Sequence, residues 1–335
     1  MELATTYLGL RLRNPLIASA SPLSRTVGGV QRLADAGVGA VVLPSLFEEQ
    51  LRREAEQDAL LADAGTDSFA ESLSYLPSTA GDEVGSRRYL SLLRRAVAAV
   101  DVPVIASLNG VTADGWVDHA SAMQEAGAAA IELNIYYLPG DVHLSGAEVE
   151  QRHLDILKRV KSAVSLPVAV KLSPYFSATA AMAVRLDEAG ADGLVLFNRL
   201  MQPDIDPETL TVTVPVALSS PAEARLPRTW IALLSGRVRG SLAATTGVEG
   251  PADVVAYLLA GADAVMTASA LLRHGPGHAT VLLDGVRDWM RAKGFTSVDQ
   301  FRGRLGVPAG DSPDGYERSS YLAAVRQATR LYWPS

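Results

Sequence analysis

Three short apolar segments of the sequence each end in a polar residue that can take part in chemistry. Ile-Glu-Leu-Asn ends at Asn134, Val-Ala-Val-Lys at Lys171 and Val-Leu-Phe-Asn at Asn198. A lysine inside an apolar segment is costly to bury unless it contacts an anion or loses its proton. Because the chain has only four lysines, we interpret Lys171 as a functional cation. The alternative is a structural salt bridge with Glu132. For Asn134 and Asn198, functional and purely structural amide hydrogen bonds both stay open.

Small residues end two further apolar segments. Thr246 and Gly247 follow Ser-Leu-Ala-Ala-Thr, and Ser269 follows Ala-Val-Met-Thr-Ala. Backbone N–H groups at such turns, and at the start of a following helix, can bind a phosphate. The alternative is that the small side chains only permit tight turns.

The sequence offers little for metal or thiol chemistry. It contains no cysteine, which excludes disulfides, thiolate metal sites and a cysteine nucleophile. His274 and His278 are four residues apart, but Gly-Pro-Gly separates them and denies them a common helix face. We therefore predict no metal site.

The elements that must position these residues follow a repeated pattern. An alanine-rich helical segment ends in a glycine turn, as at Gly37, Gly127, Gly190 and Gly261, and a short apolar segment follows. Continuous apolar segments are typical of parallel strands covered on both faces. Eight such segments, with helical patterns between them, predict a (β/α)8 TIM barrel rather than a doubly wound open sheet. They are Leu16–Ala20, Ala40–Leu43, Val104–Leu108, Ala129–Asn134, Val168–Leu172, Gly193–Asn198, Ser241–Thr245 and Ala264–Ala268.

Two connections exceed ordinary loops between a strand and the next helix. The long excursion Phe47–Ser86 follows the second strand and begins with an acidic, helical pattern. Met201–Leu218 follows the sixth strand, and its alternating Thr-Val-Thr-Val predicts a hairpin-like insertion. Phe295–Leu305 and Tyr316–Leu331 are expected to form two closing helices. We expect residues 1–335 to form one barrel domain.

Composition narrows the class of partner. The chain of 335 residues carries a formal net charge of −7, which argues against nucleic acid or an anionic membrane as the main partner. The apolar segment Val254–Leu272 is broken at its centre by Gly-Ala-Asp, so we interpret it as helix, turn and strand rather than a membrane span. A small-molecule ligand is therefore expected.

Several motifs together resemble a known family. The chain resembles the class 1 dihydroorotate dehydrogenases, which are FMN-containing (β/α)8 enzymes, over nearly its whole length. The motifs are Asn14–Ser21, Leu133-Asn134, Val170–Phe176, Thr246–Glu249 and Gly294–Gly303. Ser45–Gln50 and Phe197–Arg199 resemble the branch called dihydroorotate dehydrogenase-like.

The resemblance implies a reaction and a set of roles. In the family, a base removes the C5 proton of dihydroorotate while hydride leaves C6 for flavin N5. Lys171 corresponds to a lysine that contacts the flavin pyrimidine ring, and Asn134 and Asn198 to asparagines that hold substrate and flavin. The resemblance implies that FMN is lined by Ala20, Ser21, Ser45, Ser107, Ser219 and Ser220, with its phosphate at Thr246, Gly247, Ala268 and Ser269.

This sequence departs from the family pattern where the base should be. Tyr137 stands in place of the family's cysteine, and a phenol costs about 4 kcal/mol to ionise at pH 7 without an activating charge. Pro44 replaces a lysine at the end of the second strand, and Glu71–Ser78 replaces the loop that grips the substrate carboxylate.

Three hypotheses follow. The first is an FMN-dependent oxidoreductase acting on dihydroorotate or a related small cyclic substrate, with Lys171, Tyr137, Asn134 and Asn198 in catalysis. The second is a flavin-binding or flavin-free barrel without dehydrogenase activity that serves as a partner subunit. The third is an aldolase with a Schiff base on Lys171, which the resemblance disfavours. The resemblance also implies a cytoplasmic homodimer, or pairing with an electron-transfer subunit.

Overall fold

Eight parallel strands close into a barrel, as the sequence pattern predicts. The computed structural model describes residues 1–48, 85–110, 116–135, 139–199, 203–214, 216–311 and 313–332. Around the barrel the order is β11, β12, β3, β4, β5, β6, β7 and β8, so β8 pairs with β11 and closes the circle. The strands are β3 (Leu16–Ala18), β4 (Ala40–Phe47), β5 (Val104–Asn109), β6 (Ala130–Asn134), β7 (Val168–Leu172), β8 (Gly193–Leu196), β11 (Ser241–Ala244) and β12 (Ala264–Thr267).

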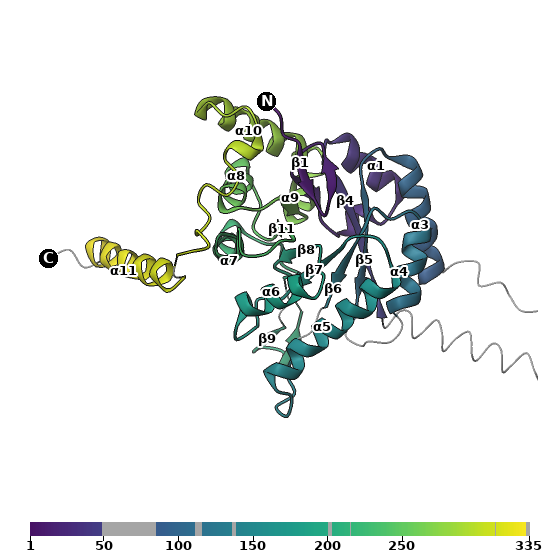
Figure 1. Cartoon of the computed structure of the whole chain (residues 1–335), viewed down its shortest axis with the longest axis horizontal. Coiled ribbons are helices and arrows are strands. Elements are labelled where there is room, and N and C mark those ends of the chain that lie inside the picture. The colour runs from purple at the N-terminus through teal and green to yellow at the C-terminus, as the bar shows by residue number, and fades with distance from the viewer. Residues whose placement is uncertain are drawn as a thin grey trace, which may run out of the picture.

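Helices form a ring outside the strands, apart from the last helix, which projects away from the barrel (Figure 1). Two of the glycine turns show why the helix–turn–strand pattern recurs. Gly190 and Gly261 have φ values of 99° and 118°, which L side chains rarely adopt, so each helix ends there and the chain turns into the next strand. The helices are α1 (Val27–Asp35), α3 (Ser86–Ala99), α4 (Trp116–Glu125), α5 (Gly146–Ala163), α6 (Thr179–Glu188), α7 (Arg225–Leu234), α8 (Pro251–Ala260), α9 (Ser269–His274), α10 (His278–Lys293) and α11 (Pro313–Tyr332).

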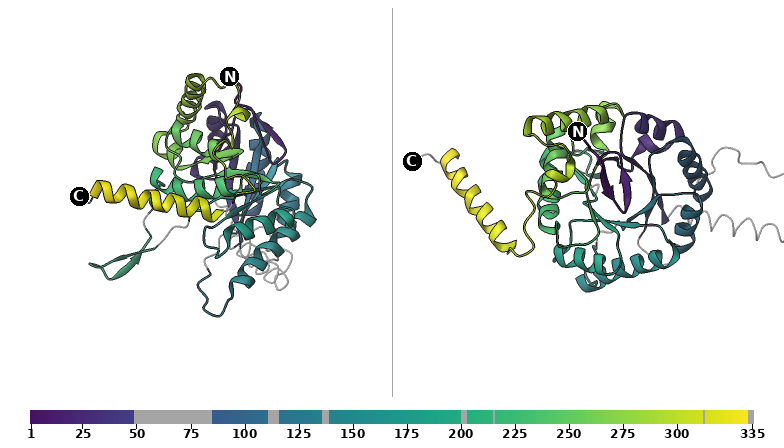
Figure 2. Two further views of the ribbon diagram at one scale, coloured as in Figure 1. Left: turned by 60° about the vertical axis from the view of Figure 1, so that its left-hand side comes forward. Right: turned by 45° about the horizontal axis from the view of Figure 1, so that its top comes forward.

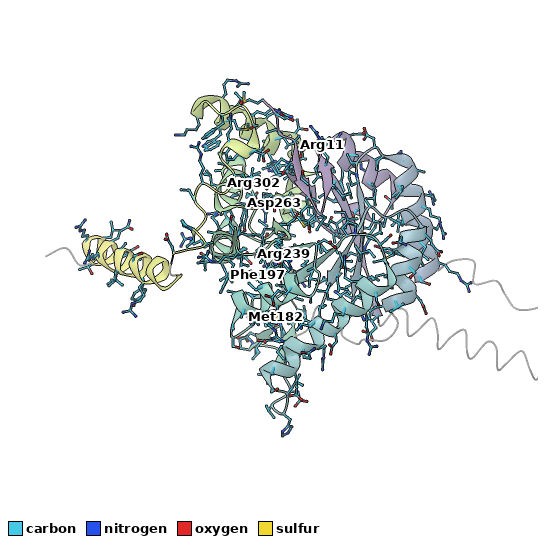
Figure 3. All side chains as sticks on the ribbon, viewed as in Figure 1. Arg11, Met182, Phe197, Arg239, Asp263 and Arg302 are labelled. Carbon is cyan, nitrogen blue, oxygen red and sulfur yellow. The ribbon has the colours of Figure 1, made fainter. Side chains whose placement is uncertain are left out.

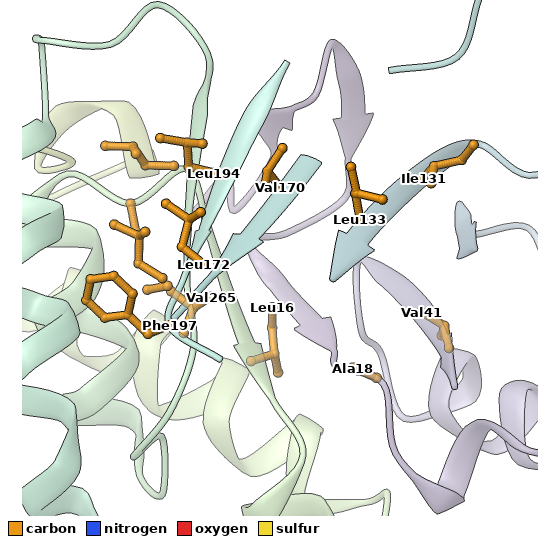
Figure 4. Close-up of a cluster of buried hydrophobic side chains, with 14 of the residues drawn as sticks. Leu16, Ala18, Val41, Ile131, Leu133, Val170, Leu172, Leu194, Phe197 and Val265 are labelled. Carbon is orange, nitrogen blue, oxygen red and sulfur yellow. The ribbon is translucent and has the colours of Figure 1, made fainter. Parts of the chain in front are cut away.

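Successive strand residues alternate between the barrel interior and the layer of helices. Outward-facing residues such as Leu16, Leu133 and Val170 join the large core between strands and helices (Figure 4). Inward-facing residues form a second, separate cluster that includes Ile17, Ile105, Ala130, Ala169 and Val195. This alternation decides which polar residues of β6 and β7 enter the barrel.

An N-terminal hairpin that the sequence analysis did not predict closes the barrel at the amino ends of its strands. Strands β1 (Thr5–Tyr7) and β2 (Leu10–Leu12) pair antiparallel, and their ribbon lies across the barrel end (Figure 2). The side chains of Tyr7, Leu8 and Leu12 pack into the inward-facing cluster. The N–H of Leu8 also donates to Ser241 Oγ at 3.0 Å. That end of the barrel is thereby filled by packed side chains.

The insertion after β8 forms the expected hairpin. Strands β9 (Asp204–Asp206) and β10 (Thr211–Thr213) pair antiparallel and project away from the barrel (Figure 2). Of the long excursion after β4, residues 49–84 lie outside the described residues.

The expectation of a closing helix over Phe295–Leu305 is wrong. At Tyr316–Leu331 the expected helix is present as α11, but it projects away from the barrel instead of closing it (Figure 1). Over Phe295–Leu305 only one turn of 3-10 helix (Val298–Gln300) forms, because the backbone N–H groups of Gly303 and Leu305 bond to carbonyls of α8 instead. Arg302 pairs with Asp263 at the same place (Figure 3).

The apolar segment Val254–Leu272 divides into the end of α8, a turn, β12 and the start of α9, as expected. Among the described helices none combines the length and the apolar character that a membrane crossing requires.

Candidate functional site

The strand register places the polar residues of β5, β6 and β7 at one end of the barrel. Asn109 pairs with Asn134, and Asn134 pairs with Lys171, so these residues stand at one level. Glu132 lies two residues below Asn134 on the same face of β6, beside Ala169. The carboxyl ends of barrel strands carry the active sites of this fold class. The structure therefore brings Asn134 and Lys171 together where the sequence pattern expects them.

Lys171 forms a buried ion pair with Glu132. Its Nζ lies 3.4 Å from Glu132 Oε1, and the two side chains are 10% and 1% exposed. The structural alternative considered for Lys171 is thus present in the molecule. It leaves a functional role open, because the ammonium has three N–H donors and this contact engages one of them.

The two asparagines contact each other across the mouth of the barrel. The Nδ2 amide of Asn198 donates to Oδ1 of Asn134 at 2.8 Å, although 64 residues separate them. The backbone N–H of Asn198 also donates to the carbonyl of Leu172 at 2.6 Å. The hydrogen bond between the side chains fixes the orientation of both amides. The Nδ2 donor of Asn134 and the Oδ1 acceptor of Asn198 then face away from this bond.

Ser45 and Ser107 are joined by a hydrogen bond of 2.8 Å between their hydroxyls. The hydroxyl of Tyr89, which is buried beside them, accepts the N–H of Ser107 at 2.8 Å. Burial raises the pKa of the Tyr89 phenol, an effect that the hydrogen bond to Ser107 opposes and the charge of Glu132 reinforces. After β3, Ala20 is half-buried, and Ser21 caps the short 3-10 helix Pro22–Ser24.

The small residues after β11 and β12 converge with Ser219. The N–H of Ser219 donates to Ser269 Oγ at 3.0 Å, and the two hydroxyls are 2.9 Å apart. The N–H of Gly247 donates to Ser219 Oγ at 3.3 Å. Ser269 begins α9, whose first N–H groups have no acceptor within the helix. Ala268 occupies the cap position just before it.

The backbone at Thr246 and Gly247 has a special conformation. Both residues have positive φ, 82° and 70°. A Cβ at position 247 would lie 2.6 Å from the backbone nitrogen of Ala224 and 2.8 Å from the carbonyl oxygen of Ser220, so only glycine fits. The N–H of Ser220 donates to Glu223 Oε2 at 2.6 Å and is thus already used.

Two charged residues and a histidine beside this loop were given no role at this site by sequence reasoning. Arg273 pairs with Glu249 and donates to the carbonyl of Ser219 at 3.2 Å. His274 Nε2 lies 2.6 Å from Glu249 Oε1. Hydrogen bonds from His274 and then Arg273, which outweigh burial, lower the pKa of Glu249. The signal available in the sequence was Glu249 itself, at the end of the Thr-Gly-Val-Glu motif.

Two cavities adjoin the barrel mouth. One of about 680 Å³ is lined by Tyr175, Phe197, Asn198, Arg199 and Thr246, among others. The other, about 750 Å³, lies between β4 and α3 and is lined by Ser45, Tyr89 and three arginines (Arg25, Arg88 and Arg95). Both volumes fall in the range of about 300–1,000 Å³ that ligand sites occupy.

Two of the sequence predictions concern residues that the structure does not describe. Tyr137, expected in place of the family's base, and Glu71–Ser78, expected in place of its carboxylate-gripping loop, lie outside the described residues. Within the described residues, no group of three or more histidine, aspartate or glutamate side chains is arranged to hold a metal ion.

Comparison with known proteins assigns this architecture to a family. The family model for dihydroorotate dehydrogenase matches residues 2–290. A protein of Aeropyrum pernix named "Putative dihydroorotate dehydrogenase A (fumarate)" is 29% identical over 313 residues, covering 90% of this chain and 97% of the relative. Two proteins named dihydroorotate dehydrogenase B (NAD(+)), catalytic subunit, are similarly close. That of Methanothermobacter thermautotrophicus is 27% identical over 319 residues and that of Methanocella arvoryzae 28% over 296. They cover 90% and 88% of this chain, and 97% and 94% of their own lengths. The chain belongs to the dihydroorotate dehydrogenase family.

Proposed function

We propose that this protein binds FMN at the carboxyl end of its barrel and is an FMN-dependent oxidoreductase of the dihydroorotate type. The observation that carries the proposal is the convergence of two polar groups at that end. Lys171, Asn134 and Asn198 form one group, and Ser219, Gly247 and Ser269, with their mutual hydrogen bonds, form the other. The first can contact a polar ring. The second can bind a phosphate, which would replace Ser269 Oγ and Ser219 Oγ as the acceptor of the N–H groups of Ser219 and Gly247.

The local backbone fits a phosphate-bearing cofactor. The exclusion of any Cβ at Gly247 and the positive φ of Thr246 bend the loop after β11 back toward Ser219, so that N–H groups rather than side chains border it. In this assignment the cofactor is lined by Ala20 and Ser21 after β3, Ser45 on β4 and Ser107 on β5. Ser220 and Ala268 complete the surroundings of the phosphate.

Bound FMN would supply a two-electron acceptor for hydride removed from the substrate. The protein's own groups have to bind and orient the cofactor and the substrate, and to stabilise the charge that develops. The Lys171 ammonium places a positive charge where negative charge develops on reduction, and its burial strengthens that effect. The linked amides of Asn134 and Asn198 present a fixed donor and a fixed acceptor to the ring or the substrate. Tyr137 is proposed as the base, which requires an activating cation nearby.

A second candidate function is a barrel that binds FMN or no flavin, lacks dehydrogenase activity and serves as a partner subunit. The absence of any cysteine from the sequence favours it, because the family's usual base cannot be present. The substrate of an active enzyme could then differ from dihydroorotate while remaining a small cyclic compound.

Colour and bleaching test the proposal. The purified protein is expected to be yellow, and dihydroorotate added without air should bleach the flavin absorbance. A colourless preparation that FMN cannot reconstitute refutes the flavin assignment. A yellow protein that dihydroorotate does not bleach has another substrate or no dehydrogenase activity.

Lys171→Ala is expected to lose flavin during gel filtration. Lys161→Ala, which removes a lysine paired with Asp192 at 2.6 Å outside the site, should retain flavin and serves as the matched control. Equal retention by the two variants would make Lys171 a structural residue.

The proposal extends to assembly and location. It takes residues 1–335 as one barrel domain in a cytoplasmic homodimer, or in a complex with an electron-transfer subunit as the word "subunit" in the relatives' names suggests. Light scattering gives the molar mass of the purified chain, alone and co-expressed with an electron-transfer subunit, and so distinguishes these assemblies.

A further inference from the structure

Glu132 is a buried carboxylate that the proposed reaction does not use. Its side chain is 1% exposed, and its Oε1 contacts Lys171 at a long 3.4 Å. Its Oε2 is buried and accepts no hydrogen bond from any described residue. Burying a carboxylate costs several kcal/mol unless a counter-charge and hydrogen bonds compensate it. Among the described residues, Lys171 is the cation that pairs with Glu132.

The titratable groups around Glu132 are its ion-pair partner and two tyrosines from different elements. Tyr7 belongs to the hairpin β1–β2, which closes the barrel at the amino ends of its strands, and Tyr89 belongs to α3. Burial first, and then the charge of Glu132, raise the pKa of Tyr7, whose hydroxyl also finds no partner among the described residues. Both phenols are therefore neutral, and neither shares the charge of the carboxylate.

We propose that Glu132 is a positioning residue that sets the charge Lys171 presents at the barrel mouth. The carboxylate holds the ammonium protonated and directed to the inner wall, and it cancels most of the positive charge that a ligand above would otherwise experience. Toward bound flavin, Glu132 thus opposes the stabilisation of the anionic reduced form that Lys171 provides. This last consequence rests on the proposed function, whereas the control of Lys171 by Glu132 does not.

Titration of Lys171 in the cofactor-free protein tests the inference directly. The chain has four lysines, so ¹³C-labelled lysine gives four Cε signals, and Lys171→Arg identifies the one of interest. In Glu132→Gln, the Lys171 signal should titrate at a pH about 1–3 units lower than in the native chain, because its counter-charge is gone. Glu132→Asp keeps the charge at a longer distance and should give a smaller shift in the same direction.

The control is Glu150→Gln, which breaks an ion pair of 2.5 Å with Arg185 between α5 and α6. It should leave the Lys171 signal unmoved. If Glu132→Gln and Glu132→Asp also leave it unmoved, the inference is overturned. If Glu132→Gln fails to fold, the shift in Glu132→Asp decides.

A second measurement tests the effect on flavin. Below the Lys171 titration point of Glu132→Gln, the variant should bind reduced FMN about tenfold more tightly relative to oxidised FMN than the native chain does. For a two-electron couple this raises the midpoint potential by about 30 mV. Above that point the difference should vanish, because the lysine is then neutral. A potential that does not change at either pH contradicts the charge-setting role, while failure to bind FMN contradicts only the proposed function.

Discussion

Replacing Tyr257 with phenylalanine should loosen the loop after β11. Tyr257 lies on α8, is fully buried, and its hydroxyl donates to the carbonyl of Thr246 at 2.7 Å. The carbonyls of Thr245 and Ala224 lie 3.3 and 3.4 Å from the same hydroxyl. The hydroxyl thus donates its one proton to Thr246 and lies against two further carbonyls beside the turn where Thr246 has positive φ.

The magnitude follows from the loss of a buried donor. A net hydrogen bond contributes about 1 kcal/mol, and a buried acceptor left without a partner costs about 1–3 kcal/mol. We expect Tyr257→Phe to lower the free energy of unfolding by about 1–2 kcal/mol. Because each 1.4 kcal/mol is a factor of ten in an equilibrium, a loss of FMN affinity of about 5- to 30-fold is expected if the whole cost falls on the loop conformation.

Urea unfolding followed by circular dichroism measures the first effect, and quenching of flavin fluorescence measures the second. Tyr7→Phe is the matched control, since its hydroxyl is equally buried but has no partner among the described residues. It should leave stability unchanged or raise it. Equal stability of the two variants would refute the reasoning, because the hydroxyl bonds of Tyr257 would then have no measurable value.

Three further predictions concern other parts of the fold. Gly247→Ala should lower the melting temperature and abolish flavin retention, because its Cβ collides with Ala224; Gly250→Ala, where a Cβ meets nothing within 4 Å, should do neither. At Asp187, burial raises the pKa, but N–H groups of Gly240 and Arg239 and the Arg239 guanidinium lower it further, so the net pKa is below the usual value. The stabilisation that the Asp187 carboxylate gives is therefore present above the unfolded-state pKa and is lost as the pH falls through the folded-state pKa. Asp187→Asn should lower the free energy of unfolding at neutral pH, and by progressively less in acid. A cost that stays constant with pH would contradict the lowered pKa of Asp187. Replacing residues 203–214 by a short Gly-Ser linker should leave the melting temperature unchanged, because the apolar residues Ile205, Leu210 and Val212 of that hairpin are more than 70% exposed. A large drop in the melting temperature would show that the hairpin supports the barrel.

The barrel was predictable because each strand can be recognised from a few consecutive residues. Its segments are continuously apolar, and glycine turns such as Gly190 and Gly261 mark where a helix ends and the next strand begins. The hairpin β1–β2 was not predictable, because three-residue strands give too short an alternation to recognise. At Phe295–Leu305 the sequence pattern predicts a helix that the structure does not have. The N–H groups of Gly303 and Leu305 bond to carbonyls of α8 instead.

The sequence alone determined which polar residues end the strands, because parallel strands of a barrel all finish at one end. Tertiary structure decided which of them meet. Asn134 contacts Asn198 and Ser219 contacts Ser269 across 64 and 50 residues of chain, and these pairs depend on barrel closure and strand register. The same holds for Lys171 and Glu132. Both alternate inward on neighbouring strands, and no other described cation reaches that carboxylate, so burial itself makes the pair obligatory.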